Sequence, residues 1–216
     1  MIKLILFDFD GVIADSNSLH AEVTRNVLSG VGLTREIADE EIYALFGKEY
    51  SVVLKELMGP DYSDKLLFRA LVLQQKMLHS DFFFNQMRLF KGVGEYLKSL
   101  RGRGFKLAVV TGNDSFFIDR AIRVLDLGDV FDLVLSSDDV ARSKPAPDMV
   151  LKAVDVFGVG LDEVLFVGDA RNDVLAAKSA GVKSVVVLSG ILDDISARAL
   201  KPDYILDDVF GLDAII

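Results

Sequence analysis

The stretch Lys3-Leu4-Ile5-Leu6-Phe7-Asp8-Phe9-Asp10-Gly11 decides how the rest of the chain is interpreted. The apolar run over residues 3–7 is too short for a helix and predicts a buried strand. If the strand continues, Asp8 and Asp10 point to the same side of it, and Gly11 permits a sharp exit. Two carboxylates packed together at a strand end are costly unless a cation or a shared proton compensates them. An ordinary acidic turn is the alternative that this stretch alone leaves open.

A second apolar run, Val164–Val167, ends in the same manner. It is followed by Gly168-Asp169-Ala170-Arg171-Asn172-Asp173, which puts Asp169 at the strand end and Asp173 at the start of the next helix. Helix capping by an aspartate would explain Asp173 on its own. Two parallel strands that each deliver carboxylates at their carboxyl ends can, however, place several oxygens around one point, and such hard oxygen ligands suit Mg²⁺.

Short apolar runs and helical stretches alternate through the second half of the chain. Further runs typical of strands buried on both faces are Leu107–Val110, Leu133–Leu135, Val185–Leu188 and Tyr204–Leu206. The helical stretches between the runs cover residues 115–126, 147–157 and 172–180. This alternation predicts the α/β class, with a doubly wound, mainly parallel sheet.

Residues 16–87 behave differently, because they contain no convincing strand. Their pattern favours helices over residues 19–28, 35–46, 50–58 and 63–78, divided by glycine-containing stretches. We therefore predict an α-helical domain over 16–87, inserted into an α/β domain formed by 1–15 and 88–216. The apolar string Phe82-Phe83-Phe84 is expected to be buried where the insert rejoins the core rather than to form an exposed patch.

Two further motifs follow predicted strands. Thr111-Gly112-Asn113 comes after Leu107–Val110 and precedes a helix, so its hydroxyl and free backbone N–H groups suit a phosphate, although a plain helix N-cap is the simpler explanation. In Ser143-Lys144-Pro145-Ala146-Pro147, Pro145 disfavours a helical Lys144. The lysine ammonium can then point at the carboxylates, and a surface lysine in a stiff loop is the alternative.

Composition narrows the chemistry. The chain has 24 Lys and Arg against 33 Asp and Glu, a formal net charge of −9, with no Cys and only two His. Cysteine-based zinc sites, disulfides and thiol catalysis are excluded, and a histidine-based triad is disfavoured. The acidic excess argues against nucleic-acid binding. No apolar run approaches the ~20 residues of a membrane span. The first run ends in carboxylates without a cleavage site, so we expect a cytoplasmic protein.

With these motifs in this order, the chain resembles the haloacid dehalogenase-like hydrolase superfamily, in its phosphoglycolate phosphatase/β-phosphoglucomutase branch. The similarity covers nearly the whole chain and rests on the aspartate pair, the threonine motif, the lysine motif and the second aspartate pair. It implies a Rossmann-like core with an α-helical cap domain inserted after the first strand. The four motifs do not specify the substrate.

The resemblance implies a role for each motif. Asp8 would be the nucleophile that forms an aspartyl-phosphate, and Asp10 the general acid and base. Thr111, Gly112 and Asn113 would bind phosphate, together with Lys144. The residues implied in Mg²⁺ binding are Asp8, Asp10 through its backbone carbonyl, Asp169 and Asp173, the last either directly, through water or by orienting Lys144.

These roles predict a Mg²⁺-dependent phosphatase, a phosphoric monoester hydrolase, that acts on a small phosphorylated metabolite such as phosphoglycolate or a sugar phosphate. A phosphosugar mutase would use the same intermediate, and a receiver-like signalling domain would form phospho-Asp8 without turnover. In the insert, Lys48 is a possible substrate contact or a solvated lysine, and we prefer both to a Schiff-base role. We expect no membrane or nucleic-acid partner, and a monomer or homodimer.

Overall fold

The computed structural model describes all residues from Met1 to Ile216. The chain divides into two compact units, one formed by Met1–Asp15 with Arg88–Ile216 and the other by Ser16–Met87. These bounds coincide with those expected for the α/β domain and its helical insert. Each unit is described by itself.

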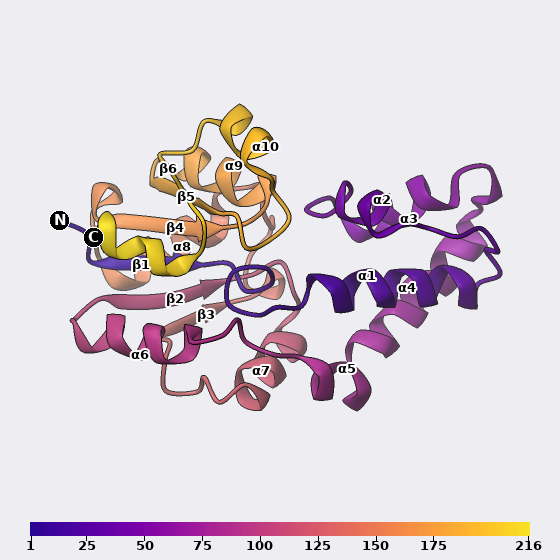
Figure 1. Cartoon of the computed structure of the whole chain (residues 1–216), viewed down its shortest axis with the longest axis horizontal. Coiled ribbons are helices and arrows are strands. Elements are labelled where there is room, and N and C mark those ends of the chain that lie inside the picture. Colours follow the sequence, from indigo (N-terminus) through magenta and orange to yellow (C-terminus); the bar gives the residue numbers. More distant parts are fainter. The chain divides into compact units, whose positions relative to one another are not determined.

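The first unit is built on a six-stranded sheet in the order β3-β2-β1-β4-β5-β6, and every neighbouring pair is parallel (Figure 1). The predicted α/β class with a doubly wound sheet is therefore confirmed. The strands are β1 (Leu4–Phe7), β2 (Lys106–Val110), β3 (Leu133–Leu135), β4 (Val164–Gly168), β5 (Lys183–Val187) and β6 (Tyr204–Leu206).

Helices cover both faces of this sheet. The α-helices are α6 (Val93–Gly102), α7 (Ser115–Val124), α8 (Asp148–Phe157), α9 (Arg171–Ala180) and α10 (Asp194–Leu200), and the 3₁₀ helices are η2 (Ser137–Asp139), η3 (Leu161–Glu163) and η4 (Val209–Ala214). Helix α9 contacts both α8 and α10, whereas α6 contacts η4. Right-handed crossovers produce this segregation, because the strand order runs one way from β1 to β3 and the other way from β4 to β6.

Burial on both faces explains why the central strands are continuously apolar. All residues of β1 and β4 are buried, and Leu6 and Phe166 belong to a core cluster that includes Met149 and Val150 of α8. This places the ends of β1 and β4 side by side in the middle of the sheet, where Leu4 pairs with Val164 and Phe7 with Val167. Functional groups that follow these two strands therefore meet at the carboxyl edge of the sheet.

The second unit is helical, as its sequence indicates. It contains α1 (Asn17–Gly30), α2 (Asp39–Tyr43), α3 (Tyr50–Met58), η1 (Gly59–Asp61), α4 (Asp64–Leu78) and α5 (Asp81–Gln86). The helix expected over residues 35–46 is wrong in extent, since only Asp39–Tyr43 is helical. The Arg35 guanidinium binds Glu41 and the Leu57 carbonyl oxygen instead of extending that helix, and Gly47 has a left-handed φ of 83° after it.

The expected burial of the phenylalanine string is only partly correct. Ser80 caps α5 by accepting a hydrogen bond from the Phe83 N–H, so all three phenylalanines lie on one short helix. Successive helical residues point about 100° apart, so they cannot all face one core. Phe83 and Phe84 are buried, whereas Phe82 is 66% exposed.

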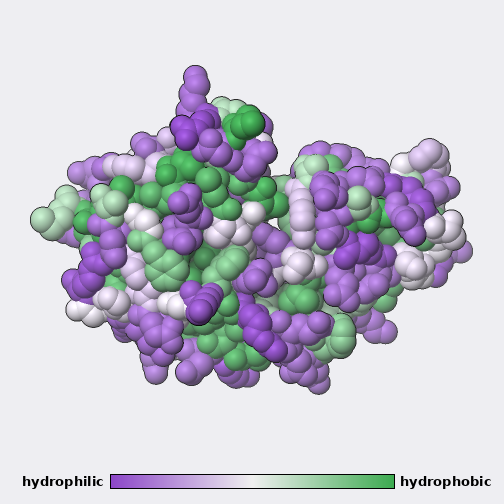
Figure 2. All heavy atoms as spheres, in the orientation of Figure 1, coloured by the Kyte–Doolittle hydropathy of each residue, from purple (hydrophilic) through white to green (hydrophobic).

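The face drawn in Figure 2 carries hydrophilic residues over much of its area, with areas of apolar residues between them. None of the helices combines the length and the low polarity needed to cross a bilayer.

Candidate active site

The aspartate pair lies where the sequence places it, directly after β1. Phe9 is completely buried, so the alternation along the chain turns the flanking Asp8 and Asp10 away from the core. Gly11 adopts a left-handed φ of 74°, which a residue with a side chain rarely tolerates. The hydroxyl of Ser189 donates to the Gly11 carbonyl oxygen at 3.0 Å and secures this turn against the loop that follows β5.

The second aspartate pair follows β4. Asp169 and Asp173 are each 2% exposed. Asp173 Oδ2 accepts the Ala170 N–H at 3.0 Å, so this residue does contribute to capping α9, while its Oδ1 is 2.7 Å from Lys144 Nζ. The structural and the functional explanations of Asp173 are therefore compatible. A Cβ on Gly168 would collide with the Asp173 side chain, which explains the glycine that ends β4.

Lys144 reaches the carboxylates rather than the surface. Its ammonium lies 2.8 Å from Asp8 Oδ1 and 2.7 Å from Asp173 Oδ1, and it donates to the Val110 carbonyl oxygen at 3.1 Å. The side chain is only 7% exposed. Burial by itself would lower the pKa of Lys144, but the charges of Asp173 and Asp8 outweigh it and raise that pKa. The lysine is a permanent cation at the centre of the site.

For Asp8, in contrast, burial is the dominant influence on the pKa. Burial raises the pKa of Asp8, the charge of Asp173 raises it further, and Lys144 opposes both, so that the pKa is about 7. Asp8 Oδ1 accepts the Phe9 N–H at 2.7 Å in addition to the lysine. The other oxygen, Oδ2, accepts no hydrogen bond from the chain. Asp8 thus presents one secured oxygen and one that is available for chemistry.

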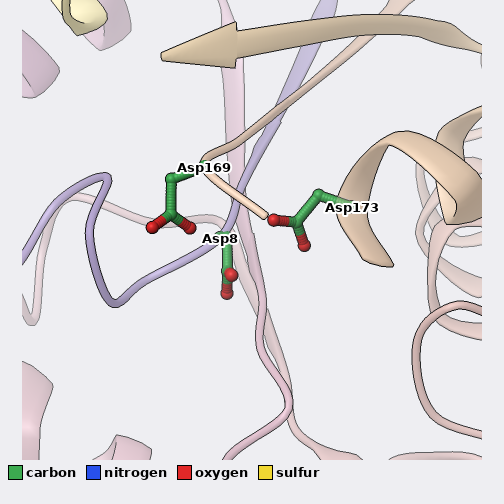
Figure 3. Close-up of side chains that lie close together, drawn as sticks. All are labelled: Asp8, Asp169 and Asp173. Atoms are coloured by element: carbon green, nitrogen blue, oxygen red, sulfur yellow. The ribbon is translucent and has the colours of Figure 1, made fainter. Parts of the chain in front are cut away.

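Asp8, Asp169 and Asp173 lie together at the site (Figure 3), and one carboxylate oxygen from each lies within 4.8 Å of the other two. Three carboxylates against the single ammonium of Lys144 leave this cluster with excess negative charge, which is costly in a buried site. The donor set consists of hard oxygens from two strand ends and from the first turn of α9. These residues fit a divalent cation such as Mg²⁺.

The third motif follows β2. Thr111 is 1% exposed, and its Oγ1 accepts the Asn113 backbone N–H at 3.2 Å. The possibility that Thr111 is a plain helix N-cap is wrong, because Asp114 caps α7 by accepting the Phe117 N–H at 2.8 Å. Gly112 is exposed beside it. The Asn113 side chain donates to Asp10 Oδ2 at 2.6 Å and so connects this motif with the first one.

The remaining sequence-predicted residue, Lys48, belongs to the helical unit. Its ammonium lies 2.9 Å from both carboxylate oxygens of Glu56, within that unit.

The loop after β5 was not identified from the sequence as part of the site. The loop after β5 holds Asp169, since Asp169 Oδ2 accepts the Ile191 N–H at 3.0 Å and a Cβ on Gly190 would collide with the Asp169 carboxyl group. The Ser-Gly pair after a predicted parallel strand is the sequence signal that could have indicated this loop.

Comparisons with known proteins agree with this geometry. The family model for the haloacid dehalogenase-like hydrolases matches residues 5–187. A phosphoglycolate phosphatase of Nitrosospira multiformis is 31% identical over 97% of this chain and 93% of its own, and the pyrophosphatase PpaX of Halalkalibacterium halodurans is 29% identical over 95% and 92%. The solved structure of a hydrolase from Pseudomonas syringae superposes with a TM-score of 0.83 at 25% identity, covering 100% of this chain and 99% of that one.

The chain belongs to the haloacid dehalogenase-like hydrolase family. The resemblance drawn from the four motifs is thereby confirmed, and so is the predicted enzyme class, a phosphatase of this family.

Proposed function

We propose that this protein is a Mg²⁺-dependent phosphatase that hydrolyses a small phosphorylated metabolite through an aspartyl-phosphate on Asp8. The observation that carries the proposal is the state of Asp8, whose Oδ1 is held by Lys144 and the Phe9 N–H while Oδ2 accepts no hydrogen bond. An oriented carboxylate with one available oxygen is what an in-line attack on phosphorus requires.

In the first half-reaction, Asp8 Oδ2 attacks phosphorus and the bond from phosphorus to the leaving oxygen breaks. Asp10 donates its proton to that oxygen. Lys144 neutralises part of the charge that would otherwise repel a phosphate dianion from the carboxylate. The Thr111 hydroxyl and the N–H groups near exposed Gly112 bind the phosphoryl oxygens.

In the second half-reaction, a water molecule attacks phosphorus, Asp10 accepts its proton, and the bond between phosphorus and Asp8 breaks. This releases inorganic phosphate and restores both carboxyl groups. Asp8, Asp169, Asp173 and the Asp10 carbonyl would hold the Mg²⁺. When bound, the metal supplies positive charge that compensates both the aspartates and the transferred phosphoryl group.

Phosphate release from a panel of metabolites in the presence of Mg²⁺ tests the proposal. The names of the relatives favour phosphoglycolate and pyrophosphate as first members, and sugar phosphates complete the panel. We expect Asp8→Asn, Asp10→Asn and EDTA each to abolish nearly all release. Asp119→Asn, an exposed aspartate of the same unit, is the matched control and should be unchanged. Full activity of Asp8→Asn would refute the mechanism.

A phosphosugar mutase remains the second candidate, because it would use the same aspartate pair and return the phosphoryl group to the sugar. Formation of an isomeric sugar phosphate without free phosphate would identify it. A long-lived phospho-Asp8 without turnover would instead identify a receiver-like domain. Asp10 argues against that outcome, since a receiver has no need of a second catalytic carboxylate.

The helical unit, residues 16–87, is proposed to act as a cap that selects the substrate and excludes bulk water. Lys48 is a candidate for the substrate contact, in competition with its pair to Glu56. Lys48→Ala tests this role. A higher KM with an unchanged kcat would support a binding contact. Equal kinetics would assign Lys48 to the ion pair alone.

A further inference from the structure

The side-chain amide of Asn113 joins two residues of the proposed site. Its Nδ2 lies 2.6 Å from Asp10 Oδ2 and 3.1 Å from Thr111 Oγ1. A carboxamide nitrogen carries two hydrogens and no more. Both are used, one on the carboxylate and one on the hydroxyl.

These contacts determine what the Thr111 hydroxyl can do. Oγ1 accepts the Asn113 backbone N–H at 3.2 Å as well as the side-chain amide at 3.1 Å. A hydroxyl oxygen has two lone pairs and one hydrogen, so both acceptor positions are occupied. The only capacity that remains to the Thr111 hydroxyl is donation, in a direction away from Asn113.

Asn113 is itself held from a different element. Its carbonyl oxygen accepts the Ser137 N–H at 2.9 Å and the Ser137 hydroxyl at 3.1 Å, both from η2. Asp138 of the same turn accepts the N–H and the hydroxyl of Ser115 at 2.8 Å. Turning the amide over would put its oxygen against Asp10 Oδ2, where two acceptors would repel each other. Asp10 therefore fixes the donating orientation, and the Thr111 hydroxyl, which can donate or accept, becomes an acceptor towards the amide.

We propose that Asn113 is a positioning residue, which makes the Thr111 hydroxyl an obligate donor to phosphate and orients Asp10 beside it. This rests on the proposed function, because it concerns the same site. Phosphoryl oxygens accept hydrogen bonds and do not donate at full ionisation. A hydroxyl that can only donate binds them, whereas one that is free to turn spends part of its time presenting a lone pair.

The effect of each substitution follows from this role. Asn113→Ala removes one of the two hydrogen bonds that the Thr111 hydroxyl accepts, while the backbone N–H of residue 113 keeps the other. It should weaken binding of inorganic phosphate about tenfold, as expected for one hydrogen bond to a charged group. Asn113→Asp has nearly the same shape but replaces donors by acceptors. It should weaken phosphate binding by about a hundredfold or more, since it repels both Asp10 and the phosphate.

A double-mutant cycle separates positioning from a general structural effect. Binding of inorganic phosphate is measured by calorimetry in the presence of Mg²⁺, which requires no turnover. Asn113→Ala should cost about tenfold in the wild-type chain and in Thr111→Ser, which keeps the hydroxyl, but less than about twofold in Thr111→Val, which lacks it. Ser137→Ala, which removes one of two bonds to the Asn113 carbonyl oxygen, is the matched control and should stay within twofold.

Two results would overturn the inference. One is an Asn113→Ala protein that binds phosphate as tightly as the wild type, and the other is an equal loss in the Thr111→Val background. Thermal denaturation of each variant identifies any that fail to fold. If Thr111→Val is one of them, phosphate binding is compared between Thr111→Ser with and without Asn113→Ala, and between the wild type and Asn113→Asp. A wild-type protein that binds phosphate with this coupling but hydrolyses no substrate would refute the proposed function and leave the role of Asn113 supported.

Discussion

We expect Asp8→Asn to stabilise the metal-free protein although it removes the proposed nucleophile. Asp8 is buried next to Asp173, and these two influences raise its pKa to about 7 from the ordinary 3.8 despite the attraction of Lys144. A raised pKa means that folding disfavours the ionised carboxylate. Asparagine has nearly the same shape and carries no charge, and Lys144 keeps its 2.7 Å contact with Asp173.

The size of the effect follows from the pKa difference. Ionised Asp8 lowers the free energy of unfolding by at most about 4 kcal/mol, since each pKa unit corresponds to about 1.4 kcal/mol. This pKa already includes the attraction of Lys144, and an asparagine N–H left without a partner at the position of Oδ2 offsets part of the gain. We expect a net gain of about 2 kcal/mol, or a midpoint of thermal unfolding raised by about 5 °C for a chain of this size.

The pH dependence supplies an internal check. Below about pH 4, Asp8 holds its proton in the folded and the unfolded states, so the charge contributes nothing. Between about pH 4 and 7 the folded state keeps a proton that the unfolded chain releases, so the wild type loses stability as the pH rises. The difference in the free energy of unfolding between Asp8→Asn and the wild type should therefore grow from pH 4 to pH 7 and reach its full size above pH 7.

Urea and thermal denaturation in EDTA at pH 5 and pH 8 measure the effect, with Asp119→Asn as the exposed control. Added Mg²⁺ should then stabilise the wild type more than Asp8→Asn, because the substitution removes a proposed ligand. An Asp8→Asn protein that is less stable than the wild type at pH 8 in EDTA would refute the reasoning. It would show that the attraction of Lys144 exceeds the cost of burial and the repulsion from Asp173.

Three further substitutions test other parts of the structure. Lys144→Met leaves Asp8 and Asp173 buried without a cation and should lower the free energy of unfolding by about 3–5 kcal/mol in urea denaturation, and an unchanged value would contradict the central role of the ion pair. Gly190→Ala displaces Asp169 and should weaken Mg²⁺ binding in calorimetry about tenfold, whereas Gly102→Ala, at an open position, should leave it unchanged. Burial raises the pKa of Tyr50 to about 12, so the folded state keeps a proton that the unfolded chain loses above about pH 10, and stability should fall between pH 10 and 12. Tyr50→Phe should remove that fall in urea denaturation, and an unaltered alkaline fall would assign it to other groups.

The sheet was largely predictable from the sequence because its strands form short, continuously apolar runs, of which the central ones are fully buried and the edge strands β3 and β6 partly buried. Runs such as Leu133–Leu135 and Tyr204–Leu206 match the observed strands residue for residue. The four motifs were predictable for a related reason. Each lies after an apolar run, and the end of that run marks the end of a strand. The sequence does not state that β4 lies next to β1. That neighbourhood depends on the direction in which the chain crosses the sheet, and it brings Asp169 beside Asp8.

What could not be predicted depends on contacts between distant segments. The extent of α2 is limited by Arg35, which binds the Leu57 carbonyl oxygen instead of continuing the helix. The exposure of Phe82 follows from a short helix that begins at the Ser80 cap. In the site, the Asn113 side chain donates hydrogen bonds to Asp10 and Thr111. The Thr111-Gly112-Asn113 motif by itself suggested only that the backbone N–H groups bind phosphate. The extent of α2 and the orientation of the Asn113 amide are decided by partners far along the chain, whereas the exposure of Phe82 depends on where a short helix begins.

Backbone amides explain how the chain keeps three buried carboxylates together. Asp8 accepts the Phe9 N–H, Asp169 the Ile191 N–H and Asp173 the Ala170 N–H, each through one oxygen. Such bonds orient a carboxylate and favour its ionised form without cancelling its charge.

When all three carboxyl groups are ionised, the one ammonium leaves two negative charges uncompensated, which is the charge of one divalent cation. Neutralising the cluster with side chains alone would require two further lysines or arginines packed against it. If the proposed function is correct, a bound dication compensates this charge before phosphate binds, and phosphate affinity should depend on Mg²⁺ more steeply than on general ionic strength.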